Sequence, residues 1–221
     1  MSETSSKFPP RLSRSAKVLH RWRPVLADHT DCADQLLSDA QQRLPDLAAR
    51  VAVPSTFCRG LLERAILPGA ALYLELRDHV DADRALSLTG ACIAADAERR
   101  ARRVQMVDRT PWLFPVFRRM MRRTVRHSYV PPAWEAQLVE DTAQRVRVDV
   151  TRCYYDDTLT TLGIPELTAR YCPNDDIIWG NLRTIEFRRT GTLADGCDKC
   201  DGCFERREDH GRGRPVDQAN A

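Results

Sequence analysis

From about residue 31 to residue 126, apolar side chains recur every three or four positions, which is the spacing of an amphipathic helix. Two sets of side chains each fall on one helical face: Leu36, Leu37, Ala40 and Leu44, and Phe57, Leu61, Leu62 and Ala65. Longer helices are predicted over about 83–106 and 111–127. Prolines stand where these helices are expected to begin or end, at Pro45, Pro54 and Pro68-Gly69. The N-terminal half is therefore predicted to be helical.

The period changes after residue 132. Between residues 145 and 151 every second residue is valine and the others are charged or polar, which predicts a half-buried strand. Its expected partners in the sheet are the segments 137–140, 182–189 and 204–206. Short helices are expected at 156–162 and from Pro165 towards Trp179. The pattern predicts an α+β fold, with a helical N-terminal half packed on a small antiparallel sheet with helices in the C-terminal half.

The two ends of the chain show no apolar period. Residues 1–28 and 208–221 are rich in polar residues, proline and glycine, and both are predicted to be disordered tails. Between them we expect a helical region over 29–130 and an α+β region over 131–207. A chain of 221 residues can form these as one integrated domain.

Composition and charge argue against several functions. The 34 lysines and arginines against 31 aspartates and glutamates give a net charge of +3, too mild to indicate a nucleic-acid partner. The arginines over 111–127 are interpreted as a solvated helix face. No apolar run reaches the roughly 18 residues of a membrane span, and no apolar segment typical of a secretory signal follows the N-terminus. We therefore expect a cytoplasmic protein without a membrane partner.

Eight cysteines are the most informative feature of the composition. Cys197, Cys200 and Cys203 form a C-x-x-C-x-x-C run whose thiolates could bind zinc, or an iron–sulfur cluster, with a fourth ligand from Cys172, Cys153 or a carboxylate. The second C-x-x-C pair and the histidines typical of a zinc finger are missing. The alternative is that these thiols lie in a tight turn without a ligand.

A second candidate site is the segment around Cys172. Asp175 follows it by three residues, so thiol and carboxylate would share a face if the segment is helical. That arrangement would provide a nucleophile beside a general acid or base, although Pro173 disturbs the backbone between them. The alternative is a small buried thiol beside a capping residue. Cys153, at the end of the valine strand, has the same two interpretations.

Residues 153–204 resemble the C-terminal signature of the L-2-amino-thiazoline-4-carboxylic acid hydrolase family. The matching stretches are CYYDDTLTTLGIPELTARYCPNDD (153–176) and FRRTGTLADGCDKCD (187–201), with weaker similarity back to Pro111. The family signature has a cysteine with an aromatic, a Gly-x-Pro-Glu-Leu turn, a cysteine with a trailing aspartate, an Arg-Thr-x-Thr-Leu strand, and a glycine with a final Cys-Asp pair. The matching residues here are Cys153, Tyr154 or Tyr155, Gly163, Pro165, Glu166, Leu167, Cys172, Asp175, Arg189, Thr190, Thr192, Leu193, Gly196, Cys200 and Asp201.

The resemblance implies a hydrolase that opens a C–N bond in a small cyclic amidine-like or thiazoline amino-acid-type substrate carrying a carboxylate. On this basis Cys172 adds to the electrophilic ring carbon, Asp175 moves a proton to and from the ring nitrogen, and Arg189 binds the substrate carboxylate. The remaining candidates around the site are Cys153, Cys200 and Asp201.

The sequence departs from the signature in two ways. Gly202 replaces the aromatic residue that usually follows the final Cys-Asp pair, and Cys197 and Cys203 are additional thiols. These departures are compatible with divergence into a biosynthetic pathway. Two other functions remain as alternatives: a thiolate-ligated zinc or iron–sulfur protein with a structural or redox role, and a non-catalytic small-molecule sensor. Nothing in the sequence specifies the oligomeric state.

Overall fold

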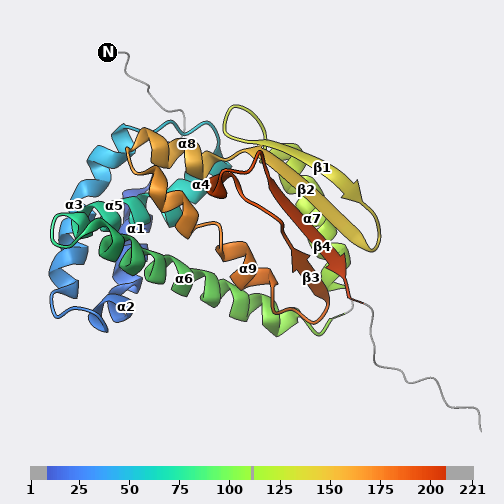
Figure 1. Ribbon diagram of the computed structural model, residues 1–221, viewed down its shortest axis with the longest axis horizontal. Coiled ribbons are helices and arrows are strands. Elements are labelled where there is room, and N and C mark those ends of the chain that lie inside the picture. The colour runs from blue at the N-terminus through green and yellow to red at the C-terminus, as the bar shows by residue number, and fades with distance from the viewer. Residues whose placement is uncertain (1–8, 111, 208–221) are drawn as a thin grey trace, which may run out of the picture.

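The computed structural model describes residues 9–110 and 112–207 (Figure 1). The helical part consists of α1 (Leu12–Arg21), α2 (Arg23–Ala27), α3 (Ala33–Ala49), α4 (Thr56–Leu61), the π-helical η1 (Leu62–Ile66), α5 (Leu67–Arg77), α6 (Ala82–Val107) and α7 (Leu113–His127). The C-terminal part consists of β1 (Glu135–Asp141), β2 (Arg145–Arg152), α8 (Tyr154–Thr161), the 3-10 helix η2 (Pro165–Arg170), α9 (Asn174–Trp179), β3 (Ile185–Arg188), the 3-10 helix η3 (Leu193–Asp195) and β4 (Cys200–Arg206). The predicted α+β class is confirmed.

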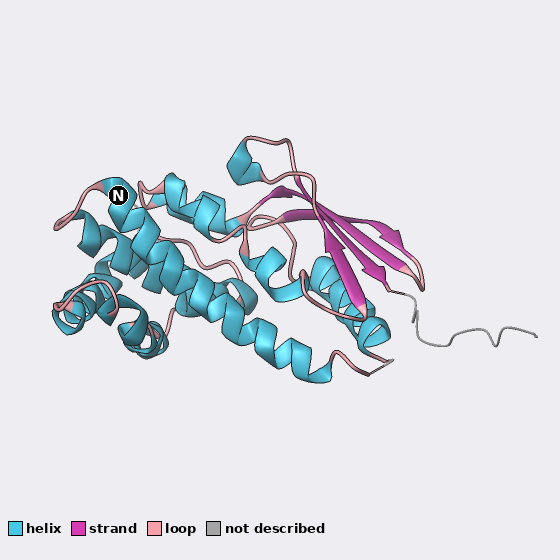
Figure 2. Ribbon diagram, turned by 60° about the horizontal axis from the view of Figure 1, so that its bottom comes forward, coloured by secondary structure: helices cyan, strands magenta, loops and turns pink. Residues whose placement is uncertain are grey.

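The four strands form one antiparallel sheet in the order β1-β2-β4-β3. Strand β4, the last one in the described part of the chain, therefore lies inside the sheet, between β2 and β3. Val150 of β2 is paired with Cys200 of β4, and Val148 is paired with Gly202. Figure 2 shows the strands gathered at one end of the molecule while helices fill the rest. Because paired residues lie on the same face, the valine face of β2 continues across β4.

Helix α7 packs on this valine face. The ring centroids of Phe117 and Phe204 lie 4.6 Å apart, which joins α7 to β4. Arg118 and Arg122 both donate hydrogen bonds to the carboxylate of Asp141 at the end of β1. The interpretation of the α7 arginines as a solvated face is therefore wrong for these two, which attach the helix to the sheet.

The other face of the sheet is charged. Arg145 of β2 forms an ion pair with Glu205 of β4, at 2.7 Å, and Asp149 forms one with Lys199. This face follows from the alternation of valine with charged residues in β2, because successive side chains of a strand point to opposite faces. The apolar face is left to pack against helices.

The prediction of a disordered N-terminal tail is wrong for residues 12–27, which contain α1 and α2. Leu19 and Trp22 are almost fully buried. The carboxylate of Glu63, in η1, is inaccessible to solvent and accepts hydrogen bonds from the Arg14 guanidinium (2.9 Å) and the Arg11 backbone N–H (2.7 Å). Buried apolar residues of α1 and α2 are separated by arginines and serines, which concealed the period in the sequence. Residues 1–8 and the predicted tail 208–221 lie outside the described residues.

Two proline positions differ from the predictions. Pro45 lies inside α3 rather than at its end, and the helix expected from Pro165 towards Trp179 is instead η2, a turn and α9. Pro173 separates the two, since proline cannot donate the hydrogen bond that a continuous helix requires. No helix in the described part of the chain is long and apolar enough to cross a membrane.

Candidate active site

A pocket of about 370 Å³ lies between the valine face of the sheet and the helices α6, α7 and α9. This volume falls in the range of small-molecule sites. Of the six residues predicted as catalytic, five line the pocket: Cys153, Cys172, Asp175, Arg189 and Cys200. They come from four separate segments between residues 153 and 200, so tertiary structure has brought them together.

Strand alternation determines which C-terminal cysteine reaches the pocket. Cys200, Gly202 and Phe204 of β4 line it. Cys203 belongs to the opposite face, where the charges of Arg145 and its neighbours act on it. Gly202, which replaces the aromatic of the family signature, therefore leaves space in the wall of the pocket next to Cys200.

The three-cysteine metal site is not formed. Cys200 and Cys203 are three positions apart on a strand and so lie on opposite faces, while Cys197 is exposed before the strand begins. Among the described residues, no group of three or more histidine, cysteine, aspartate or glutamate side chains is arranged to hold a metal ion. The strand geometry thus removes the basis for a shared zinc or iron–sulfur site at Cys197, Cys200 and Cys203.

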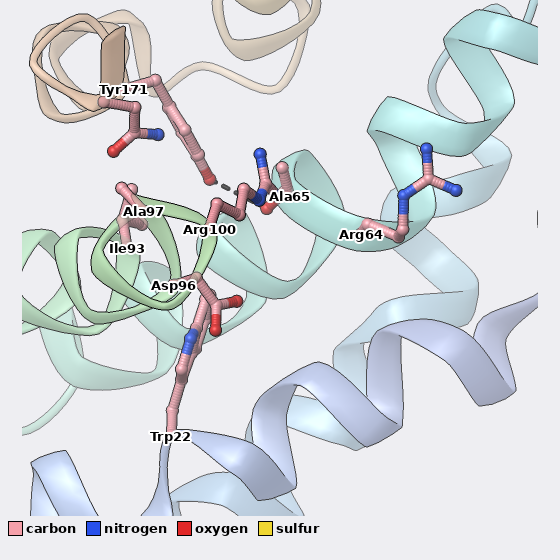
Figure 3. A pocket seen from close by; sticks show the side chains of 9 residues that line it. Trp22, Arg64, Ala65, Ile93, Asp96, Ala97, Arg100 and Tyr171 are labelled. Atoms are coloured by element: carbon pink, nitrogen blue, oxygen red, sulfur yellow. Dashed lines mark hydrogen bonds between the residues drawn. The ribbon is translucent and has the colours of Figure 1, made fainter. Parts of the chain in front are cut away.

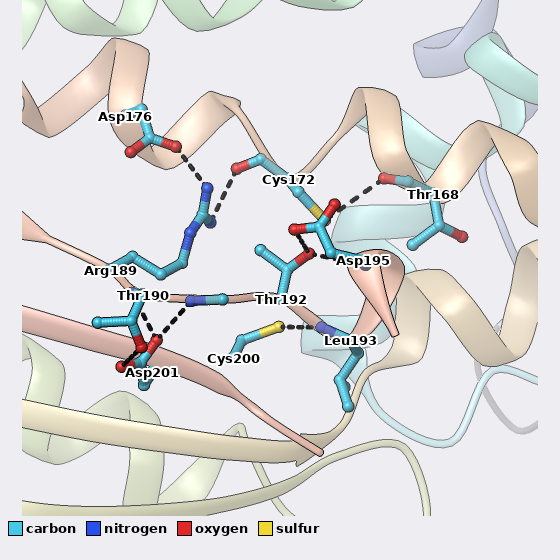
Figure 4. Close-up of polar contacts among 11 residues, drawn as sticks. Thr168, Cys172, Asp176, Arg189, Thr190, Thr192, Leu193, Asp195, Cys200 and Asp201 are labelled. Atoms are coloured by element: carbon cyan, nitrogen blue, oxygen red, sulfur yellow. Dashed lines mark hydrogen bonds and ion pairs between the residues drawn. The ribbon is translucent and has the colours of Figure 1, made fainter. Parts of the chain in front are cut away.

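Cys172 lies in the turn before α9, not on a helix with Asp175. Its sulfur is 3.6 Å from the carbonyl oxygen of Thr168 and lies beside the hydroxyl of Thr192, which in turn donates to Asp195 at 2.7 Å (Figure 4). Burial raises the pKa of the Cys172 thiol, and the Thr192 hydroxyl and the charge of Arg189 partly offset that increase. Cys172 is thus a thiol at neutral pH that must lose its proton to act as a nucleophile.

The other two pocket thiols have different environments. The sulfur of Cys200 accepts a hydrogen bond from the backbone N–H of Leu193 at 3.2 Å. Burial raises the pKa of Cys200, although this hydrogen bond and the charge of Arg189 act in the opposite direction. Burial raises the pKa of Cys153 to about 12, so it stays a neutral thiol. Cys172 and Cys200 are therefore the better candidates for a nucleophile.

Arg189 already has partners within the protein. Its guanidinium forms an ion pair with Asp176 and donates to the carbonyl oxygen of Cys172 at 3.0 Å (Figure 4). It also lies 5.9 Å from the centre of the Phe187 ring. These contacts hold the turn that carries Cys172 against the end of β3.

Asp175 is the pocket carboxylate with a shifted pKa. Desolvation raises its pKa above the usual range, the neighbouring Asp176 adds to this increase, and the charge of Arg189 opposes it. Two tyrosines, Tyr129 and Tyr155, line the same pocket and lie within electrostatic range of Asp175. Neither tyrosine hydroxyl forms a hydrogen bond with another described residue, so both are free to bind a ligand.

Asp201 is the one residue of the six predicted as catalytic that does not line the pocket. Its carboxylate accepts hydrogen bonds from the Thr190 N–H (2.8 Å), the Thr190 hydroxyl (2.6 Å) and the Gly191 N–H (3.0 Å). Although desolvation raises the pKa of Asp201, these hydrogen bonds outweigh it and the pKa is lowered overall. Asp201 thus holds the segment that positions Arg189 and Thr192.

We expect Asp201→Ala to lower the free energy of unfolding by about 1–2 kcal/mol, because two partly solvent-exposed backbone N–H groups lose their acceptor. Asp201→Asn keeps an acceptor oxygen and should cost about 1 kcal/mol. Urea unfolding at pH 7 measures both. A carboxylate with a lowered pKa stabilises the fold above its ordinary pKa and loses that effect as the pH falls through the lowered value, so the deficit of the asparagine variant should shrink in acid. Equal stability of wild type and Asp201→Ala at pH 7 would refute this role.

An aromatic wall that was not predicted from the sequence lines the helical side of the pocket. Tyr129 stacks on Trp134 at 4.5 Å, Trp134 contacts Tyr155 edge-on, and Tyr155 lies 4.9 Å from Tyr171. The structure also distinguishes the two tyrosines after Cys153, since Tyr155 lines the pocket while Tyr154 is buried and donates to Ala52. Apart from its aromatic composition, this part of the sequence carries no signal for the wall.

A π-helical turn supports the same wall. The hydroxyl of Tyr171 donates to the carbonyl oxygen of Ala65 in η1, at 2.9 Å (Figure 3). A Cβ atom at Gly69 would lie 2.0 Å from that hydroxyl oxygen, so glycine is required for this close approach. Single π-helical turns occur frequently at functional sites, where they redirect backbone groups.

These features define an α+β protein with a small-molecule pocket lined by three thiols, a carboxylate and aromatic rings. The profile of the L-2-amino-thiazoline-4-carboxylic acid hydrolase family matches residues 59–204, and the chain belongs to this family. The match begins in α4 and includes η1 and α6 as well as the pocket cysteines. No curated protein and no solved structure matches the chain. The family name is that of a hydrolase acting on a thiazoline carboxylic acid.

Three further motif residues have structural roles. Gly163 has a φ of +80°, a left-handed conformation that ends α8 and that glycine adopts without strain. Leu167 is fully buried. Glu166 accepts a hydrogen bond from the Tyr73 hydroxyl at 2.7 Å, which joins η2 to α5. The Gly-x-Pro-Glu-Leu turn thus places the segment that leads to Cys172.

Proposed function

We propose that the protein hydrolyses a small thiazoline or related cyclic amidine carboxylate in the thiol-lined pocket. The observation that carries the proposal is the convergence of Cys172, Asp175 and Cys200 in one pocket of a chain that belongs to this family. The two groups that covalent hydrolysis requires, a thiol and a carboxylate with a raised pKa, both line this pocket.

The proposed reaction starts at the ring carbon that is bonded to both nitrogen and sulfur. The sulfur of Cys172 forms a bond to this carbon, the proton of the thiol passes to Asp175, and Asp175 delivers it to the ring nitrogen as the C–N bond breaks. Water then attacks the same carbon, and the Cys172 sulfur leaves and regains a proton through Asp175. One water molecule is consumed and the enzyme is regenerated.

Other pocket groups support these steps. In the proposed mechanism Arg189 and Thr192 position Cys172 and favour its thiolate. The N–H of Leu193 keeps Cys200 in place at the edge of the pocket. The Tyr129 and Tyr155 hydroxyls are available to bind the amino group and the leaving nitrogen. The aromatic wall limits the access of water to the covalent intermediate.

The function is tested by incubating the full chain with L-2-amino-thiazoline-4-carboxylate and following the products by mass spectrometry. We expect a product heavier by one water molecule that carries a new primary amine and no free thiol. Release of a free thiol instead would keep the hydrolase but contradict C–N cleavage. Binding without turnover would contradict the hydrolase and favour a small-molecule sensor. The D-enantiomer serves as the substrate control.

A further inference from the structure

Arg100 is a positively charged side chain that lines the pocket. It lies near the C-terminal end of α6 and lines both the main pocket and a small adjoining crevice beside Tyr171 (Figure 3). No carboxylate in the described part of the chain forms an ion pair or hydrogen bond with it. An arginine at a pocket wall that is left unpaired by the protein is available to an anionic ligand.

The nearest acid on α6 cannot serve as its partner. Both carboxylate oxygens of Asp96 accept hydrogen bonds from Arg21, at 2.9 and 2.7 Å. Arg99 lies 3.7 Å from the same carboxylate. Asp96 is therefore already balanced by two other arginines, and its side chain is largely buried. Within the part of the chain that the structure describes, Asp96 pairs with Arg21 and Arg99, and no carboxylate pairs with Arg100.

A second unpartnered group borders the same place. The side-chain oxygen of Asn174 is buried and has no hydrogen-bond partner within the described residues. Asn174 lines both the pocket and the crevice, as Arg100 does. A buried polar atom without a partner costs free energy, and a bound ligand would remove that cost. A guanidinium can donate hydrogen bonds to both oxygens of a substrate carboxylate, and the amide oxygen of Asn174 can accept one from a neighbouring substrate N–H.

Arg189, by contrast, already forms an ion pair and a hydrogen bond within the protein. It would have to release Asp176 and the carbonyl of Cys172 to bind a substrate in the same bidentate way. Doing so would also free the turn that carries the proposed nucleophile. A residue that positions Cys172 is therefore a poor choice for the substrate anchor.

We propose that Arg100 binds the carboxylate of the substrate in this pocket, while the side-chain oxygen of Asn174 beside it accepts a hydrogen bond from a substrate N–H; this inference rests on the proposed function. Arg100 thereby selects substrates that carry a free carboxylate and orients the thiazoline ring between the aromatic wall and the pocket thiols. Neutralising Arg100 in this way also removes a positive charge that acts on Asp175. Substrate binding then makes Asp175 a stronger base.

The binding test uses a ligand that cannot react. L-Thiazolidine-4-carboxylate has a saturated ring and keeps the carboxylate, and thiazolidine is the same ring without it. By calorimetry we expect Arg100→Ala to weaken binding of the carboxylate ligand by about 10- to 100-fold, the range for a charged hydrogen-bonded contact. Binding of thiazolidine should be unchanged. Arg100→Lys keeps the positive charge but loses the planar guanidinium that can donate two parallel hydrogen bonds. Its affinity for the carboxylate ligand should lie between those of wild type and Arg100→Ala.

The matched control is Arg103→Ala. Arg103 lies one turn further along α6, has no ion pair with a described residue, and does not line the pocket. We expect its variant to bind both ligands as wild type does. A loss of affinity in Arg100→Ala that is equal for both ligands would indicate a structural role and overturn the proposal, as would no loss or the absence of binding to wild type.

Turnover is a separate measurement. If Arg100→Ala loses only carboxylate binding while wild type hydrolyses no thiazoline, the carboxylate site stands and the proposed hydrolase fails. If wild type is active and Arg100→Ala leaves both KM and ligand affinity unchanged, the proposed hydrolase function is supported. The proposed binding of the substrate carboxylate by Arg100 is then contradicted. Arg189→Ala provides a contrast, since we expect it to reduce kcat more than ligand affinity.

Discussion

Cys172→Ser is expected to reduce thiazoline hydrolysis about 10³-fold or more while the variant still binds the unreactive thiazolidine carboxylate. Serine keeps the size and polarity of the side chain, but a hydroxyl is a far weaker nucleophile than a thiolate. The bonds that hold the turn, from Arg189 to the Cys172 carbonyl and to Asp176, do not involve the sulfur. The variant should therefore lose hydrolytic activity but keep the structure of the pocket and its affinity for the unreactive ligand.

The measurement is single-turnover hydrolysis with acid quenching, followed by mass spectrometry of the peptide that contains Cys172. Wild type should show a transient substrate adduct on this peptide, and Cys172→Ser should show none. Cys203→Ser is the matched control, because Cys203 lies on the charged face of the sheet. If Cys172→Ser retained a tenth of the activity and Cys200→Ser lost it, the nucleophile would be Cys200.

Asp175→Asn should lower kcat by about 10²- to 10⁴-fold, the usual contribution of a general acid or base. Wild-type activity should fall as the pH drops through the raised pKa of Asp175, since the proposed reaction begins with its carboxylate. The acidic limb of the kcat profile should disappear in the variant. A variant with wild-type kcat at pH 7 would remove Asp175 from the mechanism.

The same substitution should raise the melting temperature at pH 7. Asp175 has a folded-state pKa above its unfolded value, so its ionised form destabilises the fold, and stability decreases as the pH rises through the window between those values. Asparagine removes the charge whose desolvation raises the pKa, and the gain should vanish below the ordinary pKa of aspartate. A purely structural aspartate would give the opposite result, as predicted for Asp201→Asn. The comparison of these two variants separates a catalytic from a supporting carboxylate.

Most elements of the fold were accessible from the sequence. The helix predicted over 83–106 is α6 at Ala82–Val107, and the valine alternation is β2 at Arg145–Arg152. These predictions succeed because the period of apolar residues reflects which face is buried. The prediction failed for residues 12–27, where the helices are short and arginines conceal the apolar positions. It also failed at Pro173, where a break in the helix moved Cys172 into a turn.

The candidate site was predictable in part. The family motif identified five of the pocket residues, and Tyr155 as one of two choices for a sixth, because their order along the chain is characteristic. Arg100 and Trp134 were missed, since an arginine among many on a helix and a tryptophan near two prolines carry no local signal. Their significance depends on what lies across the pocket from them. For Arg100 it also depends on Arg21, which occupies Asp96 from a distant part of the chain.

The sequence by itself determined the α+β class, the family signature and the residue types that the chemistry needs. It could not determine which of them meet. Because successive side chains of a strand point to opposite faces, Cys200 of β4 lines the pocket and Cys203 lies on the charged face of the sheet. The pairing of β4 with β2 brought Cys200 opposite Val150. The packing of α6 against α9 left Arg100 beside Asn174, with no ion pair to any described carboxylate. Periodicity and motifs are local properties of a chain, whereas a pocket is formed by distant segments whose contacts arise only on folding.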